Sequence, residues 1–266
     1  MTRLRSILAF TGGLALAVPA LAADVKEVRK TVDLAADGRL AIDTYKGWIE
    51  VSTWDRPQAE IYARVEPDDS DTDGHQAEKV AETEIRIEGS GSSVRVKSDY
   101  DRVRNHHHHL FSFWNEPGTL PLVRYAIRMP RTAKLEIHDY KSRTRIAGLS
   151  GELDLKTYKG EVQISEMNAP VRLETYKGEV RAEYTHFAAS EFDTHKGSIE
   201  IALPRDAVFS VNAELGRGDY RNEFATVEHT VSLGRHDHRI RDARVNGGGP
   251  TLSLHTYKGD LRIRAK

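Results

Sequence analysis

The stretch TYKGEVQI, residues 157–164, decides the fold, because close copies of it recur along the chain. TYKGEVRA begins eighteen residues later at Thr175, and THKGSIEI begins nineteen residues after that, at Thr194. Outlying copies are TYKGWIEV at Thr44 and TYKGDLRI at Thr256. Repetition at a nearly fixed period indicates a structural unit that stacks on copies of itself.

Apolar and polar residues alternate on both sides of each tetrapeptide. Leu153 and Leu155 precede the copy at Thr157, and Val162 and Ile164 follow it. A period of two indicates a half-buried strand on each side. The apolar set changes from odd to even positions across the tetrapeptide, and a glycine with positive φ can absorb that slip of one residue. The predicted structural corners are Gly47, Gly160, Gly178, Gly197 and Gly259.

Two architectures are compatible with such a unit. Each strand pair could fold back as a hairpin, or each unit could form one coil of a β-solenoid. The near-constant spacing favours the solenoid, because stacking places equivalent residues above one another. We predict an all-β fold in which residues 131–266 form a β-solenoid of 18–19-residue coils. A DYKS coil (139–142) would precede the Thr157 copy, and a weaker coil around LGRGDY (215–220) would follow the Thr194 copy.

Stacking would arrange the tyrosines and lysines of the repeat in rows, with about 4.8 Å between neighbours. One interpretation is a self-stacking, charge-balanced edge, in which Glu161 and Glu179 screen the lysines. The functional interpretation is a strip that binds an extended anionic or sugar-rich polymer, since aromatic rings carry sugars and lysines meet carboxylates or phosphates. The ligand-strip candidates are Tyr45, Lys46, Tyr140, Lys141, Tyr158, Lys159, Tyr176, Lys177, His195, Lys196, Tyr257 and Lys258.

Residues 23–130 have a different pattern. Five segments rich in β-branched residues predict strands, and GSGS (89–92) predicts a turn. Between Asp71 and Glu84, an Ala/Glu/Lys-rich segment predicts one short helix. We expect this β-rich region to pack on or cap the solenoid, because an open end would expose unpaired strand edges.

The first 22 residues have the order of a secretory signal peptide. Arg3 and Arg5 precede an apolar run over residues 7–18, and cleavage is expected after Ala22. A retained anchor is the alternative, although the run is short for a membrane span. We therefore predict an exported chain, in the periplasm or at the cell surface, with no transmembrane span after signal cleavage.

Composition excludes several classes of function. The chain has 39 basic and 40 acidic residues, which gives no support for nucleic-acid binding, and no cysteine to form disulfides. No phosphate-binding loop, dinucleotide fingerprint or nucleophile elbow occurs in the sequence. We expect no cofactor and a non-catalytic protein. The alternatives are a polysaccharide-acting β-helix enzyme and a regulatory partner of another envelope protein.

Four consecutive histidines, His106, His107, His108 and His109, could hold a metal ion, because neutral imidazoles bind zinc, copper or nickel. Adjacent residues of a strand point to opposite sides, so only alternate histidines could share one ion. No carboxylate or cysteine at the usual ligand spacing supports a closed site. An exposed polar loop is the alternative.

Three features together resemble a known family: the Y-x-I-x-x-P step (Tyr125, Ile127, Pro130), the T-x-x-G coils and the segment NGGGPTLSLHTYKGDLRI from Asn246. They resemble the bacterial putative-adhesin domain, a family of exported envelope proteins, over most of residues 35–266. The resemblance implies a right-handed β-helix-like fold at the envelope or surface. It also implies a binding or scaffold function, whose partner would be an unknown envelope polymer or protein.

Overall fold

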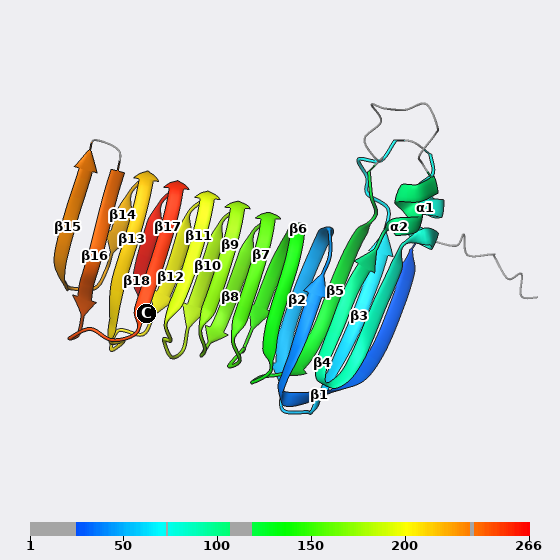
Figure 1. The fold of residues 1–266 in the computed structure, drawn as a ribbon, viewed down its shortest axis with the longest axis horizontal. Helices are drawn as coiled ribbons and strands as arrows, with labels where there is room; N and C mark the ends of the chain where they lie inside the picture. The colour runs from blue at the N-terminus through cyan, green and yellow to red at the C-terminus, as the bar shows by residue number, and fades with distance from the viewer. Residues whose placement is uncertain (1–24, 73, 107–118, 235–236) are drawn as a thin grey trace, which may run out of the picture.

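The chain forms strands over most of its length, and these lie side by side in one elongated stack (Figure 1). This computed structural model describes residues 25–72, 74–106, 119–234 and 237–266. The predicted all-β class is confirmed, because strands predominate and belong to one continuous sheet. The predicted signal peptide, residues 1–22, lies outside the described residues.

The sheet winds so that the stack has two principal strand rows, each with an outward side. We call the first the tyrosine face, whose strands in spatial order are β1 (Lys26–Asp43, second half), β6 (Lys134–Ala147, first half), β7 (Leu153–Lys159), β9 (Val171–Lys177), β11 (Ser190–Lys196), β17 (Thr251–Lys258) and β13 (Phe209–Arg217). We call the second the arginine face, with β3 (Gln58–Glu66), β5 (Leu122–Pro130), β2 (Lys46–Trp54), the second half of β6, β8 (Val162–Met167), β10 (Val180–Tyr184), β12 (Ile199–Leu203), β18 (Leu261–Ala265) and β14 (Tyr220–Asn222).

Coils pair in parallel and place equivalent residues opposite one another. Leu153 of β7 lies opposite Leu135 of β6 on one side and Val171 of β9 on the other. Thr175 is in turn opposite Thr157 and Thr194. This register follows from the repeat, because a slip of one residue would turn every buried side chain outward.

The coils do not follow one another in sequence order. The coil of β17 and β18 lies between the coil of β11 and β12 and the coil of β13 and β14 (Figure 1). The coil around LGRGDY was expected to follow the Thr194 copy directly, and this expectation was wrong. After β14 the chain forms β15 (Thr226–Gly234) and β16 (Asp237–Val245), and β16 pairs antiparallel with the free side of β13.

Residues that belong to the first part of the chain also enter the stack. The second half of β1 and most of β2, Lys46 to Ser52, pair with β6, so residues 39–52 form a coil beside the DYKS coil. Next to them lie β3, β5 and β4 (Glu84–Asp99). The predicted division at residue 130 stays a prediction.

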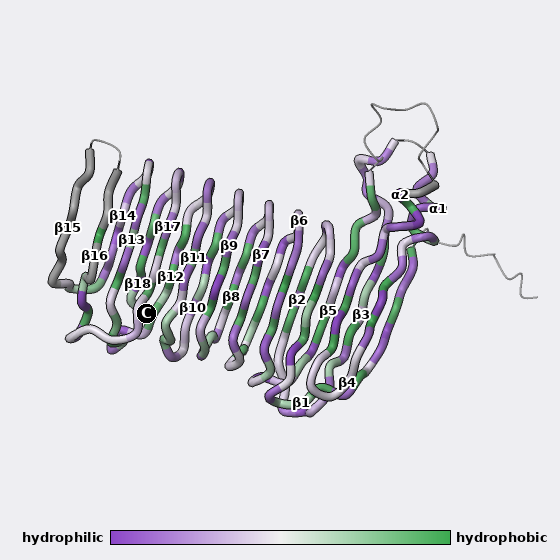
Figure 2. The backbone as a smooth tube through the Cα atoms, in the orientation of Figure 1, coloured by the Kyte–Doolittle hydropathy of each residue, from purple (hydrophilic) through white to green (hydrophobic). Residues whose placement is uncertain are grey.

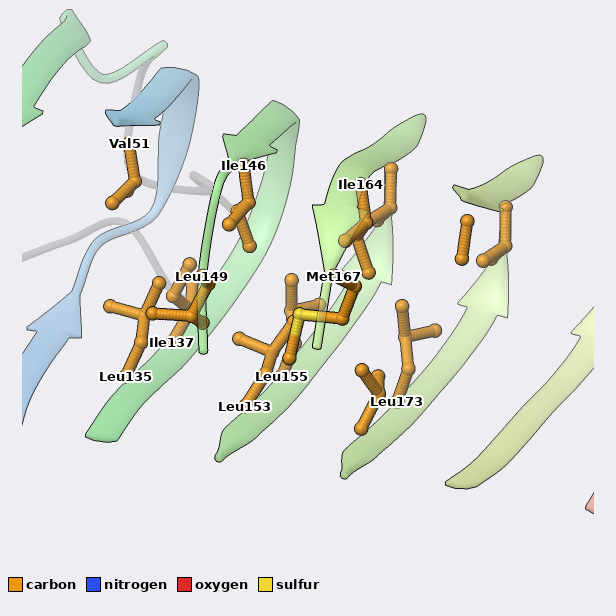
Figure 3. Packing of buried hydrophobic residues seen from close by; sticks show 14 of the residues in the cluster. Val51, Leu135, Ile137, Ile146, Leu149, Leu153, Leu155, Ile164, Met167 and Leu173 are labelled. Atoms are coloured by element: carbon orange, nitrogen blue, oxygen red, sulfur yellow. The ribbon is translucent and has the colours of Figure 1, made fainter. Parts of the chain in front are cut away.

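Alternating side chains fill the space between the two strand rows. Leu155, Ile164 and Leu173 are almost completely buried, and the same positions of neighbouring coils stack above them (Figure 3). The hydropathy colours alternate along the strands in the same way (Figure 2). Full burial of such a side chain contributes about 1.5–3 kcal/mol, which explains how a chain without cysteines is stabilised.

The corner glycines lie where neighbouring coils approach most closely. A Cβ atom on Gly178 would lie 1.6 Å from the carbonyl oxygen of Gly160, and one on Gly197 would lie 1.7 Å from that of Gly178. Positive φ is not the shared cause, because Gly178 is not among the positive-φ glycines. The corner therefore requires glycine chiefly because another coil's backbone occupies the position of a side chain.

Two short helices lie at one end of the described structure, whereas the sequence predicted one. α1 (Gln76–Glu82) corresponds to the predicted helix, and α2 (Asp101–His106) was not predicted. The buried Lys79 of α1 donates to Asp71 at 2.7 Å and so fixes the helix to the preceding loop. The predicted GSGS turn also differs, because residues 89–92 lie inside β4, where Gly89 and Gly91 have positive φ.

Candidate ligand-binding strip

Six aromatic rings stack along the tyrosine face, each from a different coil. Successive ring centres are 4.8–5.0 Å apart and nearly parallel, in the order Tyr45, Tyr140, Tyr158, Tyr176, His195 and Tyr257. Four of the tyrosines remain 38–50 % exposed. The spacing matches the distance between strands, so the rings follow the backbone without a change of register.

Each end of this ring stack has a distinct structure. Beyond Tyr45, the ring of Tyr100 is at 6.3 Å and turned edge-on, and the guanidinium of Arg104 lies 6.0 Å from the Tyr45 ring centre. Beyond Tyr257, the next coil has Gly216, between two residues paired with Thr256 and Lys258. The stack ends there because Gly216 has no side chain.

A row of cations runs beside the rings. The Cα register pairs each lysine with its counterpart in the next coil, in the order Lys46, Lys141, Lys159, Lys177, Lys196 and Lys258, with Arg217 following. Two neighbouring charges at a strand spacing of about 5 Å repel by about 1 kcal/mol even in water. Such a row is therefore an electrostatic cost unless an anion meets it.

Lys46 differs from the rest of the row. It is buried and donates to Asp68 at 2.5 Å. Burial would raise the pKa of Asp68, but the hydrogen bonds from Lys46 and Ser70 outweigh burial and lower the pKa to about 2. Lys46 is thus occupied by an internal partner and is the least suitable of the candidates for a ligand.

The other five lysines make no ion pair with any residue that the structure describes. Lys159 and Lys196 instead lie near rings of the stack, with their Nζ atoms 5.3 Å and 5.8 Å from the ring centres of Tyr158 and Tyr176. Their positive charge therefore faces solvent alongside exposed aromatic surface.

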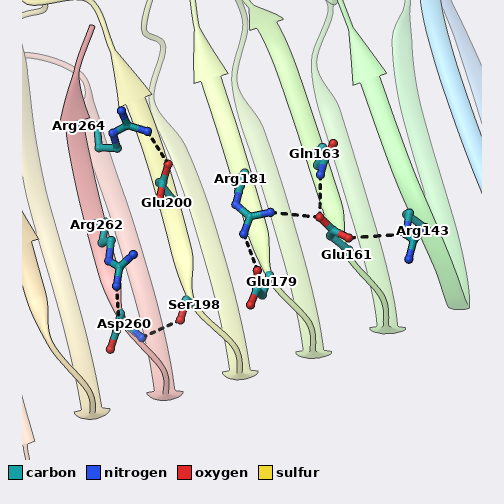
Figure 4. A network of polar contacts seen from close by, with 10 residues as sticks. All are labelled: Arg143, Glu161, Gln163, Glu179, Arg181, Ser198, Glu200, Asp260, Arg262 and Arg264. Atoms are coloured by element: carbon teal, nitrogen blue, oxygen red, sulfur yellow. Dashed lines mark hydrogen bonds and ion pairs between the residues drawn. The ribbon is translucent and has the colours of Figure 1, made fainter.

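Among the described residues, Glu161 and Glu179 make no ion pair with a lysine of the row, and the screening of the lysines by these two acids stays a prediction. Glu161 pairs with Arg143 at 3.6 Å and with Arg181 at 3.1 Å, and Glu179 pairs with Arg181 at 2.7 Å (Figure 4). Glu161 and Glu179 follow the corner glycines and pair with arginines of the arginine face, and they line one hollow at the corner together with Lys159 and Lys177. Arginine rather than lysine neutralises the acids of the repeat.

On its other side, the ring stack borders a hollow of about 520 Å³ that contains Asp139, Glu174 and Asp193. Asp139 stands where the repeat has threonine, and it accepts hydrogen bonds from the Ser142 amide at 2.7 Å, the Ser142 hydroxyl at 2.6 Å and the Thr157 hydroxyl at 2.9 Å. Burial nevertheless raises its pKa to about 6, which these hydrogen bonds only partly oppose. Its oxygens are engaged by the corner, so its role is structural.

The histidine cluster lies largely beyond the described structure. His106 ends α2, and His107, His108 and His109 lie outside the described residues. Where the structure is described, no group of three or more histidine, cysteine or acidic side chains could hold a metal ion. Within the same residues, no helix has the length and apolarity to span a bilayer.

The repeat analysis missed the contribution of the arginine face. Position five after the corner has a small residue in four coils, Ser52, Ala147, Ser165 and Ala202, and position three has a charged residue in all the repeat coils except that of Gln163. This pattern is present in the sequence, but it lies outside the repeated Thr-Tyr-Lys-Gly tetrapeptide on which the sequence prediction was based.

Comparison with models of protein families assigns the chain to a family. The model of the family described as Toastrack DUF4097 matches residues 131–264, half of the chain. The chain belongs to this Toastrack family. The membership confirms the resemblance to the putative-adhesin domain, and the family name agrees with the rack of parallel coils in Figure 1.

Several solved structures are similar to this Toastrack chain. A protein described as a putative cell adhesion protein from Clostridium sporogenes is 13 % identical, with a TM-score of 0.45 over 91 % of this chain and 100 % of that one. A putative adhesin from Bacteroides fragilis is 12 % identical, with a TM-score of 0.32 over 90 % and 97 % of the two chains. No curated protein matches the chain. Similarity at these scores carries no argument about function.

Proposed function

We propose that this Toastrack chain is an exported, non-catalytic binding or scaffold protein of the cell envelope. Its ligand strip would be the exposed ring stack with the lysine row beside it. The observation that carries the proposal is the row of five lysines that form no ion pair with any described residue, next to stacked and exposed rings. The right-handed winding, the 18–19-residue coil and the location in periplasm or at the surface remain parts of this proposal.

The chemistry of the strip favours an extended anionic polymer. Cations repeated at strand spacing match a chain that carries a carboxylate, sulfate or phosphate at short intervals, and such a chain would remove the repulsion within the row. The rings offer flat apolar surface for the sugar or carbon skeleton of the same polymer. Acidic polysaccharides combine both features.

The test is a binding experiment with the Lys159→Ser/Lys177→Ser double variant. We expect wild-type protein to bind at least one of a panel of acidic cell-wall polysaccharides, with an affinity that falls as salt is added. The double variant should fold and lose most of that affinity. A matched control is Arg262→Ser/Arg221→Ser, which removes the same charge from two arginines that lie in register and near Asp260 and Asp219.

The two variants separate specific binding from a general effect of charge. An equal loss of affinity in the lysine and arginine double variants would show that net charge, not the strip, attracts the polymer. No binding of any acidic polymer at low salt would reject the strip as a ligand site.

The alternative function is a polysaccharide-acting enzyme, for which the raised pKa of Asp139 is the favouring observation. The four hydrogen bonds to its carboxylate, which include one from the Lys141 amide at 3.3 Å, favour a structural role instead. Turnover of a polysaccharide by wild-type protein that is absent in Asp139→Asn would establish the enzyme. A regulatory partner of another envelope protein is the third possibility.

A further inference from the structure

A second hollow lies on the arginine face, away from the ring stack. Its volume is about 900 Å³, and its lining residues come from strands β3, β5, β2, β6, β8, β10, β12 and β18. It therefore crosses most of the stack, along the direction in which the coils repeat. None of the rings or lysines of the ligand strip lines it.

Short side chains form the floor of this groove. Ser52 lies opposite Ala147, and Ala147 lies opposite Ser165, so a row of methyl and hydroxyl groups runs across three neighbouring coils. Arg128, opposite Ser52, bounds this row on one side, and on the other side Glu183 bounds it, with Ala202 opposite Glu183 in the coil beyond. A flat molecule can approach the sheet closely over these three coils, because the floor between Arg128 and Glu183 has only short side chains.

The walls of the groove have balanced charge. Arg145 pairs with Glu50 at 3.7 Å, and Arg264 pairs with Glu200 at 3.0 Å (Figure 4 shows the second pair). The charged lining residues are Arg128, Arg145, Arg181, Arg264, Glu50, Glu60, Glu183 and Glu200. Equal numbers of each sign give no net attraction for a charged polymer, in contrast to the lysine row.

We propose that this groove binds a neutral, hydroxyl-rich glycan chain lying along the stack. A sugar hydroxyl both donates and accepts hydrogen bonds, so it can accept from a guanidinium and donate to a carboxylate of the same wall. The ion pairs hold these side chains in place before binding, which lowers the entropy lost on association. The shallow floor fits the face of a sugar ring, whose C–H groups contact the methyl groups of the alanines.

The groove and the ligand strip would recognise different ligands. Binding at the strip should weaken with salt, whereas binding in the charge-balanced groove should change little. The two sites lie on different strand rows and come near each other only at the corner, where Lys159 and Lys177 line a small hollow together with Arg181 of the groove wall.

The experiment titrates the full chain with neutral hexasaccharides, namely maltohexaose, cellohexaose and laminarihexaose, by isothermal titration calorimetry at low and high salt. We expect saturable, salt-independent binding of at least one of them. Ala147→Trp or Ser165→Trp would fill the floor and should weaken that binding at least about tenfold, which corresponds to about 1.4 kcal/mol. Arg145→Gln tests a wall residue without filling the groove.

Two controls make the result specific. Ser253→Trp places the same bulky side chain on the tyrosine face and should leave hexasaccharide binding unchanged, as should Lys159→Ser/Lys177→Ser. If no hexasaccharide binds, or if binding survives both in Ala147→Trp and in Arg145→Gln, the proposal is wrong. Loss of binding in the lysine double variant would also overturn it, because the glycan would then occupy the strip.

Discussion

The ring of Tyr257 stacks on that of His195 at 5.0 Å, although β13, β14, β15 and β16 all lie between them in the sequence. The ring stack is therefore completed by a coil that the chain places between two earlier ones. The stacking of these two rings follows the register of β11 and β17, in which Thr194 lies opposite Thr256. A continuous surface is built from a discontinuous order of coils.

Replacement of Gly178 by alanine should lower the free energy of unfolding by about 3 kcal/mol or more, because even the first side-chain atom meets the Gly160 carbonyl. Gly178 has no positive φ, so backbone strain does not contribute. The measurement is urea denaturation. The control is Gly247→Ala, where φ is positive but the space is open, and about 1 kcal/mol is expected. Similar losses in the two variants would contradict the close-approach explanation.

Asp139→Asn should change how stability depends on pH. The pKa of Asp139 rises from 3.8 to about 6 on folding, so the folded state holds the proton more tightly. Its contribution to stability is greatest below pH 4 and decreases as pH rises through 6, by up to about 3 kcal/mol. Unfolding free energies measured across this range should therefore fall less steeply with pH in the variant. Identical pH profiles for the two proteins would refute the assignment.

Removal of the Lys79 charge should destabilise the end of the stack that contains the helices. Lys79→Met leaves Asp71 buried without its 2.7 Å partner, and such a loss costs about 3–5 kcal/mol. Lys79→Met/Asp71→Leu should recover a large part of that loss, because no buried charge remains. Thermal melting of the three proteins gives the comparison, and a double variant no more stable than Lys79→Met would count against a buried ion pair.

Tyr158→Ser should separate ring stacking from hydrogen bonding by the phenol. Tyr158 stacks on both Tyr140 and Tyr176, and each aromatic contact contributes about 0.5–1.5 kcal/mol. We expect a loss of about 1–3 kcal/mol for serine and almost none for Tyr158→Phe, measured by urea denaturation. A loss for phenylalanine as large as for serine would show that the hydroxyl, not the ring, is needed.

The repeat predicted the stack because its physical requirements are local. The alternation of apolar and polar residues over residues 153–164 determines two half-buried strands. The constant spacing of the tetrapeptides determines the register between neighbouring coils. The order of the coils could not be predicted in the same way. Coils with the same apolar positions can neighbour each other in any order, so the apolar pattern of β17 does not show that this strand lies between β11 and β13.

The candidate site could be predicted only in part. The tetrapeptide gives a row of rings and a row of lysines, but it does not show which cations have partners. Glu161 is two residues from Lys159 in sequence, yet the corner directs it to arginines of neighbouring coils. Likewise, a glycine in the pattern does not distinguish positive φ from the approach of another backbone, and Gly178 required the structure to decide.

The position of the β17–β18 coil also imposes an order on assembly. While the chain emerges from its first residue onward, β11 and β12 are made before the strands that cover them, and β13 and β14 cannot dock on them directly. Until residues 251–265 have been synthesised, β11 and β12 lack the neighbouring strands that cover them in the folded protein. The coils of this protein therefore cannot complete their native contacts in sequence order, and until then the edge of β11 and β12 is open to wrong pairing.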